Sequence, residues 1–158
     1  MNTRTASRIH VLRDIAADDA QGIPADGVLR DTAVQALDGR LAGELNMRIV
    51  SRTESQRLNA QFRGKHKPTN VLSFTPDLPA GFPVALAGDL ALCAAVIRQE
   101  AEDQGKPLEA HWRHMIVHGC LHLCGYDHQS DADAESMEAL EVALLAGMGV
   151  SNPYLSPN

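Results

Sequence analysis

Hydrophobic and polar residues along this chain recur with two distinct periods. Leu45, Met47 and Ile49 are separated by polar residues, which is the pattern of a strand with one buried face. Other segments with strand character are residues 7–13 (an edge strand), 71–75 and 84–93. Three- and four-residue spacing predicts helices over residues 26–41, 53–62, 94–104, 107–124 and 130–148. Strands come mostly first and helices dominate the end, so we expect one α+β domain spanning residues 1–158.

End signals place the helix boundaries. Asp26 is a suitable N-cap for the first helix, and residues 53–56 fit a capping box for the second. Gly105 is expected to end the third helix, and Pro107 suits the first turn of the fourth. Ser130 is expected to open the last helix.

Composition excludes several classes of protein. The chain is 44% hydrophobic and 22% charged, which is typical of a folded globular domain rather than a disordered one. The N-terminal residues lack the apolar core of a secretory signal. The longest nearly apolar run, residues 81–97, is interrupted and falls short of the ~20 residues that cross a bilayer. Three cysteines are too few for a disulfide scaffold, so we expect a cytoplasmic protein.

Histidines are concentrated on one predicted helix. Four of the seven fall between His111 and His122, and His118 lies one turn from His122. Side chains at i and i+4 lie ~6 Å apart, close enough to share a metal ion. The opposite side of this helix is apolar. The sequence therefore predicts a helix with a hydrophobic back and a histidine front that faces a cleft.

A third histidine completes a metal-binding pattern in the segment HGCLHLCGYDH, residues 118–128. Gly125 ends the helix and lets the chain turn, which brings His128 back ten positions after His118. The spacing H-x3-H-x5-H matches the three ligands of the zincin motif. Three imidazoles leave a fourth position open, as in catalytic zinc sites, so we predict that His118, His122 and His128 hold one zinc ion. Imidazole ligands also accept nickel and other divalent ions, so the identity of the metal stays open.

Two neighbours of these ligands bear on the reaction. In metalloproteases the residue after the first histidine is a glutamate that acts as general base, and here it is Gly119. This absence counts against a protease. Asp127 is expected to orient a ligand or a turn.

The remaining histidines and cysteines of the same region receive separate interpretations. His114 either supports the ligands or lines the cleft beside them, or it has no role in the metal site. His111 is expected at the surface. Cys120 and Cys124 are expected to be small buried hydrophobic residues.

Positive charge is unevenly distributed. The chain has 14 Lys+Arg against 20 Asp+Glu, a net charge of −6. Residues 48–67 contain six basic residues and one acid, so this segment carries +5 and the other residues carry −11. The segment is either an ordinary solvated face or a phosphate-binding face. In the second interpretation Arg63 points into the cleft and its guanidinium binds a phosphodiester.

The residues quoted above resemble the YbeY family of bacterial rRNA maturation factors. The resemblance rests on HGCLHLCGYDH (118–128), LNAQFRGKHKPTNVLSF (58–74) and GDLAL (88–92), in the order and spacing of the family. It implies a small mixed sheet packed against a helical layer, zinc on His118, His122 and His128, and Arg63 as the catalytic arginine. Asn70 and Thr75 depart from residues common in the family.

The implied activity is that of a metal-dependent endoribonuclease specific for single-stranded RNA. The implied substrate is the 3′ end of 16S rRNA precursors, with a role in ribosome quality control and with the small ribosomal subunit or its proteins as partners. Two alternatives stay open: a non-catalytic ribosome-assembly factor with structural zinc, and a metalloprotease, which Gly119 disfavours. Whether a zinc-bound water or the 2′-hydroxyl of the RNA attacks the phosphate is not decided by the sequence.

Overall fold

A four-stranded mixed sheet organises the fold, in a computed structural model that describes residues 8–15, 20–76, 86–127 and 129–155. The strands lie in the order β1-β2-β4-β3. β2 pairs in parallel with β1 and with β4, whereas β3 pairs antiparallel with β4. Their bounds are Ile9–Asp14 for β1, Glu44–Val50 for β2, Val71–Phe74 for β3 and Leu86–Cys93 for β4. The predicted edge strand near the N-terminus is confirmed as β1, although residue 7 lies outside the described residues.

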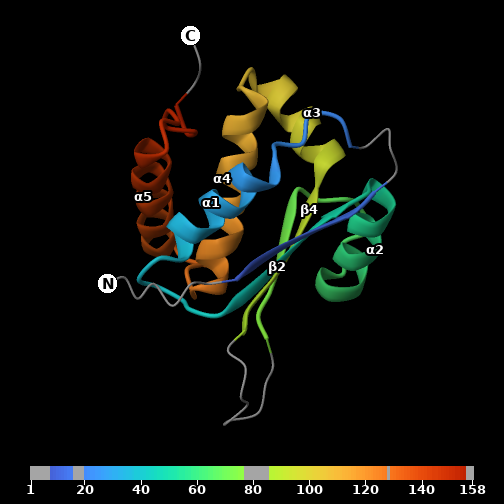
Figure 1. Ribbon diagram of the computed structural model, residues 1–158, viewed down its shortest axis with the longest axis horizontal. Coiled ribbons are helices and arrows are strands. Elements are labelled where there is room, and N and C mark those ends of the chain that lie inside the picture. Colours follow the sequence, from blue (N-terminus) through green and yellow to red (C-terminus); the bar gives the residue numbers. More distant parts are fainter. Residues whose placement is uncertain (1–7, 16–19, 77–85, 128, 156–158) are drawn as a thin grey trace.

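Helices cover both faces of this sheet, as Figure 1 shows. Their bounds are Asp26–Leu37 for α1, Arg52–Arg63 for α2, Ala94–Gln104 for α3, Leu108–Leu123 for α4 and Asp131–Gly147 for α5. α1 and α4 lie on one face and α2 on the other, and α5 packs on the outer side of α4. The predicted fold class, a single small α+β domain with a mixed sheet against a helical layer, is confirmed.

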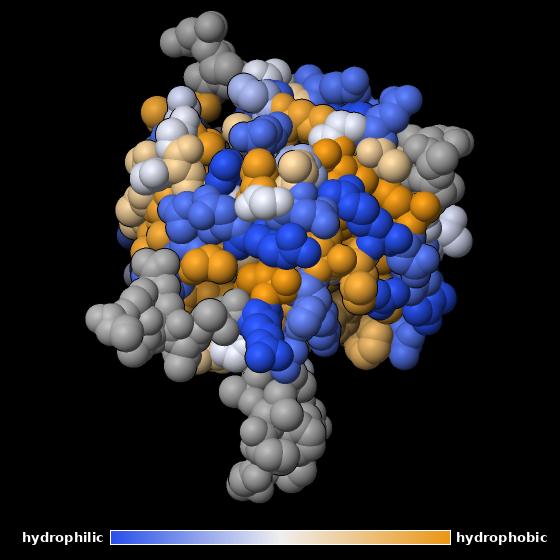
Figure 2. Space-filling view, in the orientation of Figure 1, coloured by the Kyte–Doolittle hydropathy of each residue, from blue (hydrophilic) through white to orange (hydrophobic). Residues whose placement is uncertain are grey.

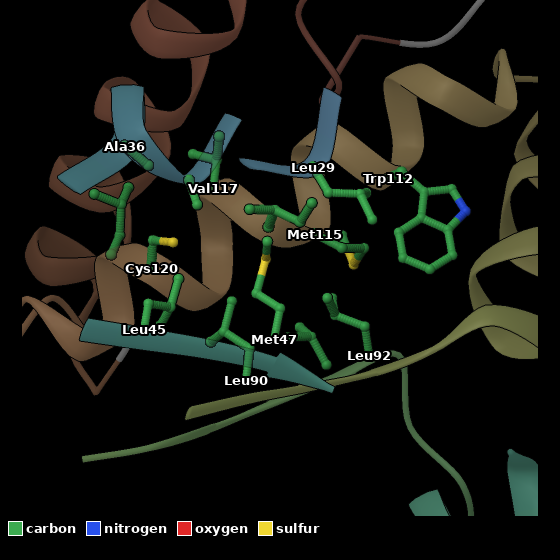
Figure 3. Packing of buried hydrophobic residues seen from close by; sticks show 14 of the residues in the cluster. Leu29, Ala36, Leu45, Met47, Leu90, Leu92, Trp112, Met115, Val117 and Cys120 are labelled. Atoms are coloured by element: carbon green, nitrogen blue, oxygen red, sulfur yellow. The ribbon is translucent and has the colours of Figure 1, made fainter. Parts of the chain in front are cut away.

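The main hydrophobic core fills the space between the sheet and α4. Leu45, Met47 and Ile49 point from β2 into this core and are fully buried, so the predicted alternation of β2 is confirmed. They belong to the same cluster as Trp112, Met115, Val117 and Cys120 of α4, and Figure 3 shows Leu45 and Met47 on the side of the sheet that faces this helix. Burying large aliphatic and aromatic side chains in this way is the dominant favourable contribution to folding.

The opposite face of the sheet has a smaller core beneath α2. It is formed by buried residues of the sheet, of α2 and of the start of α3: Val50, Leu58, Leu72, Ala91, Cys93 and Ala95. Because side chains alternate along a strand, β3 sends Leu72 and Phe74 toward α2 and Val71 and Ser73 toward α4. β3 lies at the edge of the sheet, so this strand separates the end of α2 from the histidine helix.

α4 approaches the sheet closely at Gly119. A Cβ atom at this position would lie 2.8 Å from Cδ2 of Leu90 and 3.0 Å from Cγ2 of Val71. The hydroxyl of Ser73 donates a hydrogen bond of 3.0 Å to the carbonyl of Gly119 and so ties β3 to the same turn of the helix. Any side chain added here, a glutamate included, would require these neighbours to shift. The packing therefore adds to the sequence argument against the metalloprotease alternative.

Helix ends follow the predicted signals in part. Gly105 ends α3 in a left-handed conformation, and the Ser130 hydroxyl accepts a hydrogen bond from the Asp133 amide at the start of α5, as expected. α2, however, begins at Arg52, and its N-cap is Ser51, whose hydroxyl accepts from the Glu54 amide. The predicted capping box at residues 53–56 is therefore wrong by two positions, because β2 continues to Val50 and the turn follows at once.

α1 is shorter than predicted. It ends at Leu37 instead of Leu41, and its N-cap is Ala25 instead of Asp26. Gly39 adopts a positive φ of 73°, which turns the chain out of the helix. Leu41 still packs against the core from this turn, and this explains why its spacing fitted a longer helix.

The predicted boundaries in the middle of the chain are largely confirmed. α3 spans Ala94–Gln104 as expected, and α4 begins and ends within one residue of the prediction. Residues 84 and 85 of the predicted strand lie outside the described residues.

Within the described part of the chain, no helix is long and apolar enough to cross a membrane. The face shown in Figure 2 has hydrophobic patches interspersed among hydrophilic residues.

Candidate active site

Two histidines of α4 converge on one point. The Nε2 atoms of His118 and His122 lie 3.2 Å apart, and the ring centroids are 4.7 Å apart. The two residues are one helical turn apart and lie near the C-terminal end of α4. The helix thus brings together two of the three predicted ligands, both with their outer ring nitrogens turned toward each other.

A buried carboxylate orients the first of these rings. Glu141 of α5 is fully buried, and its Oε2 atom lies 2.5 Å from Nδ1 of His118. An ionised carboxylate only accepts hydrogen bonds, so Nδ1 of His118 carries the hydrogen and donates a hydrogen bond to Glu141. Nε2 is then left with its lone pair directed toward His122. This is the tautomer that a metal-binding imidazole requires.

The other oxygen of Glu141 anchors two further groups. Oε1 accepts hydrogen bonds from the Tyr154 hydroxyl and from Nε2 of His114, the latter at 3.1 Å. Burial raises the pKa of Glu141, but the hydrogen bonds from His114, His118 and Tyr154 outweigh it and hold the pKa well below its usual range. Burial and the adjacent carboxylate raise the pKa of Tyr154. Glu141 is therefore a charged anchor that joins α4, α5 and the C-terminal segment.

Arg63 reaches the same cavity from the other side of β3. A cavity of about 380 Å³ is lined by residues of α2, the loop after it, β3, α4 and the turn beyond α4: Arg63, Thr69, Asn70, Val71, Ser73, His118, His122 and Asp127. Arg63 is the last residue of α2 and is exposed. In the part of the chain that the structure describes, no carboxylate lies within ion-pair distance of its guanidinium. The structure therefore brings Arg63 together with His118 and His122.

Buried polar residues of α2 hold the loop that follows Arg63. Gly64 adopts a positive φ of 68° and ends the helix. The Ser55 hydroxyl donates to the carbonyl of Thr69 and accepts from its amide, both at 2.9 Å. The Asn59 side chain donates to the Lys67 carbonyl at 2.8 Å. These bonds fix the path of residues 64–70 beside the cavity.

The histidine pair fits a zinc ion in geometry and chemistry. Two imidazole nitrogens bound tetrahedrally at the usual zinc distance are about 3.3 Å apart, and the pair in this structure is at 3.2 Å. Histidines that bind metal commonly donate a hydrogen bond from their other ring nitrogen to a carboxylate, and Glu141 is that carboxylate for His118. His128 lies outside the described residues, so its place is not given. Among the residues described, no three His, Cys, Asp or Glu side chains converge as a metal site.

His111 is not at the surface, contrary to the sequence expectation. It is 3% exposed, and its Nε2 atom lies 2.9 Å from Oε1 of Glu100 on α3. His114 is also buried, against Glu141 and Tyr154. The histidine side of α4 is therefore not one open cleft. α3, α5 and the C-terminal segment cover its first half, and only the half with His118 and His122 meets the cavity.

Of the two cysteines predicted to be small buried residues, Cys120 lies in α4 on the core side and Cys124 is the C-cap of this helix. Cys120 is fully buried, and burial raises the pKa of its thiol. Cys124 at the C-cap is only partly buried, and burial again raises its thiol pKa. Neither lines the cavity that contains the histidine pair.

The basic segment divides into two parts. Arg48 and Arg57 both pair with Glu54, at 3.4 and 2.7 Å, so much of their charge is balanced locally. Near the C-terminal end of α2, Lys65 and Lys67 are exposed, like Arg63, and none of the three forms an ion pair among the described residues. Arg52, at the other end of α2, is also exposed and forms no ion pair among the described residues, so only Arg63 of these cations lines the cavity.

Sequence reasoning missed Glu141, although a signal was present. The apolar side of α5 includes Met137 and Leu145, and Glu141 lies midway between them with a spacing of four residues on each side. A lone carboxylate on the buried side of a helix requires a partner. The histidines of α4 are that partner.

These features define a single-domain α+β protein with a histidine pair and an arginine in one cavity. The chain matches the family described as Endoribonuclease YbeY over residues 25–149. The chain belongs to the YbeY endoribonuclease family. This membership supports hydrolysis of RNA and a role in rRNA processing.

One solved structure supports the fold independently. The solution structure of TM1509 from Thermotoga maritima matches with a TM-score of 0.56 at 23% sequence identity, over 89% of this chain and 91% of that one. The similarity extends over nearly the whole chain, and it supports the same α+β architecture.

Proposed function

We propose that this protein is a zinc-dependent endoribonuclease that cleaves single-stranded regions of rRNA precursors. The observation that carries the proposal is the shared cavity, which joins Arg63 to His118 and His122 across the edge strand β3. A pair of candidate metal ligands and a guanidinium that forms no ion pair among the described residues lie beside one cavity, and such groups suit hydrolysis of a phosphodiester. Family membership supports RNA as the substrate.

His118, His122 and His128 would hold the metal ion. When bound, zinc acts as a Lewis acid and lowers the pKa of bound water. Glu141 keeps His118 in the tautomer that can bind metal, because its Oε2 atom accepts a hydrogen bond from the Nδ1–H group. Tyr154 and His114 in turn fix Glu141 from its other oxygen.

Arg63 would bind the scissile phosphate. Its guanidinium can donate two parallel hydrogen bonds to phosphoryl oxygens and stabilise negative charge that develops on them. Ser55 and Asn59 hold the loop after Arg63, so the end of α2 keeps its position relative to β3. Lys65 and Lys67 add positive charge along the approach to the cavity.

The natural substrate that we propose is the 3′ end of 16S rRNA precursors, processed in the cytoplasm with the small ribosomal subunit or its proteins as partners. The net charge of −6 supports a need for such partners. Because nonspecific RNA binding depends on basic side chains, binding confined to one basic segment is expected to be weak and sensitive to salt.

Cleavage of a labelled single-stranded RNA by Arg63 variants tests the proposal. Arg63→Ala is expected to lower the cleavage rate by about 100- to 1,000-fold, the usual effect of removing one donor to a developing oxyanion. Arg63→Lys is expected to retain part of the activity, because it keeps the charge but not the paired donors. Arg52→Ala, at the exposed first turn of the same helix, is the matched control and is expected to cleave normally. Wild-type activity in Arg63→Ala protein would contradict the proposal.

A further inference from the structure

A second hollow adjoins the proposed active site on the α2 face of the sheet. It has a volume of about 660 Å³, and its walls include Phe62 and Phe74 together with Arg48 and Asp89. Arg63 and Ser73 line both this groove and the cavity that contains the histidine pair. The two hollows therefore meet across the edge strand β3, and a chain lying over this edge can occupy both.

An exposed phenylalanine ring and a partly buried one lie together in this groove. Phe62 at the end of α2 is 57% exposed, although most large hydrophobic residues of the described chain are buried. Its ring packs edge to face against Phe74 of β3, with centroids 5.0 Å apart and an interplanar angle of 68°. Edge-to-face contact at this distance is a favourable geometry for an aromatic pair. A pre-ordered, solvent-exposed aromatic face is the usual platform for an unpaired base.

The charges around the groove favour an anionic chain at the Arg63 end. Arg48 is balanced by Glu54 at 3.4 Å and by Asp14 at 3.9 Å. Asp89 accepts a hydrogen bond of 3.0 Å from the Asn46 side chain. Among the described residues neither Asp89 nor Arg63 forms an ion pair, and Arg63, the cation of the two, follows Phe62 directly in the sequence. Phosphate and base contacts are thus presented side by side.

We propose that the Phe62–Phe74 pair is a stacking subsite for one unpaired nucleobase next to the phosphate that Arg63 binds. The inference rests on the proposed function, because it takes single-stranded RNA as the ligand. A base in a duplex is already stacked on both sides, whereas an unpaired base has a free face for Phe62. The subsite therefore gives the protein a preference for unpaired RNA without a requirement for a particular base.

The test compares a labelled single-stranded RNA with the same RNA made abasic, so that the phosphates stay and the bases are removed. Dissociation constants are measured by fluorescence anisotropy, with the RNA checked for integrity by electrophoresis. Phe62→Ala is expected to weaken binding of the normal RNA at least about fivefold and to leave binding of the abasic RNA unchanged. Phe62→Trp is expected to restore binding, because it restores the stacking face.

Leu12→Ala is the control, since Leu12 is a comparably exposed hydrophobic residue (51%) on β1. It is expected to bind both RNAs like the wild type. An unchanged dissociation constant for Phe62→Ala, or equal weakening for normal and abasic RNA, would overturn the subsite. Equal RNA binding by all variants is also the result expected if the groove serves a protein segment instead of a base.

Cleavage by the same variants separates this inference from the proposed function. RNA cleavage together with binding that does not depend on Phe62 would overturn the subsite alone. Binding that depends on Phe62 and on the bases, without cleavage, would overturn the endoribonuclease proposal alone. Absence of any binding to the normal RNA would overturn the subsite directly.

Discussion

The Oε2 atom of Glu141 lies 2.5 Å from Nδ1 of His118, and this contact links the outer helix α5 to the candidate active site. Glu141 is fully buried, and His118 lines the cavity. A buried carboxylate is costly unless hydrogen bonds satisfy it, and here His114, His118 and Tyr154 do so. The contact therefore sets the tautomer of a proposed metal ligand and also helps to hold α5 against α4.

Replacement of Glu141 by glutamine tests this link. Glu141→Gln keeps the size of the side chain but removes the negative charge that stabilises the Nδ1–H of His118. Loss of such support commonly lowers metal affinity by 10- to 100-fold, and we expect a decrease in this range for zinc. Competition with a chromophoric chelator measures the affinity. Glu135→Gln, at an exposed position of α5, is the control and is expected to bind zinc like the wild type. Equal affinities in the two variants would show that Glu141 does not support a ligand.

Gly119 gives a prediction about packing. The methyl group of Gly119→Ala would lie 2.8 Å from Leu90 Cδ2 and 3.0 Å from Val71 Cγ2, so these buried side chains or α4 itself must shift. Such overpacking costs about 1–3 kcal/mol, and we expect the free energy of unfolding in urea to decrease by this amount. Gly147→Ala in α5, where the added atom meets nothing within 4 Å, is expected to be neutral or stabilising by up to about 1 kcal/mol. Equal effects of the two substitutions would contradict the close approach of α4.

Glu100 gives a prediction about pH. Burial raises its pKa, but hydrogen bonds from His111 and Asn70 outweigh it, so that the pKa lies below its ordinary value of 4.5. Ionised Glu100 therefore stabilises the fold at pH values above 4.5, and this contribution is lost as the pH falls below that value. Glu100→Gln is expected to make the free energy of unfolding less dependent on pH in this acid range.

Urea unfolding at a series of pH values provides the measurement, with Glu102→Gln at an exposed position of α3 as the control. The control is expected to keep the pH dependence of the wild type. An identical acid profile for Glu100→Gln and wild type would mean that the Glu100–His111 contact does not contribute to stability.

Local patterns predicted the elements well where one face of an element meets the core. The alternation of Leu45, Met47 and Ile49 identified β2, and Gly105 identified the end of α3. The helix end at Leu37 was missed, because Leu41 continues to pack against the core after the chain has left the helix. Periodicity reports burial, and it does not distinguish a helical residue from a turn residue that is buried for another reason.

Long-range contacts account for what the sequence did not predict at the site. His111 shares a helix stripe with His118, yet Glu100 from α3 covers it, and no spacing along α4 encodes that neighbour. Glu141 was missed for the same reason, since its partners lie 23 and 27 residues away. The sequence predicted Arg63 and the histidine pair as candidate site residues, and the structure places them on one cavity. Their roles and the metal stay predictions.

Metal content and RNA cleavage, measured on one preparation of the purified protein, test the central claim most directly. We expect about one zinc ion per chain, cleavage of single-stranded RNA, loss of both on treatment with a chelator, and recovery when zinc is restored. His118→Ala is expected to lose both zinc and cleavage. Cleavage that persists unchanged after metal removal, and in His118→Ala protein, would contradict the account.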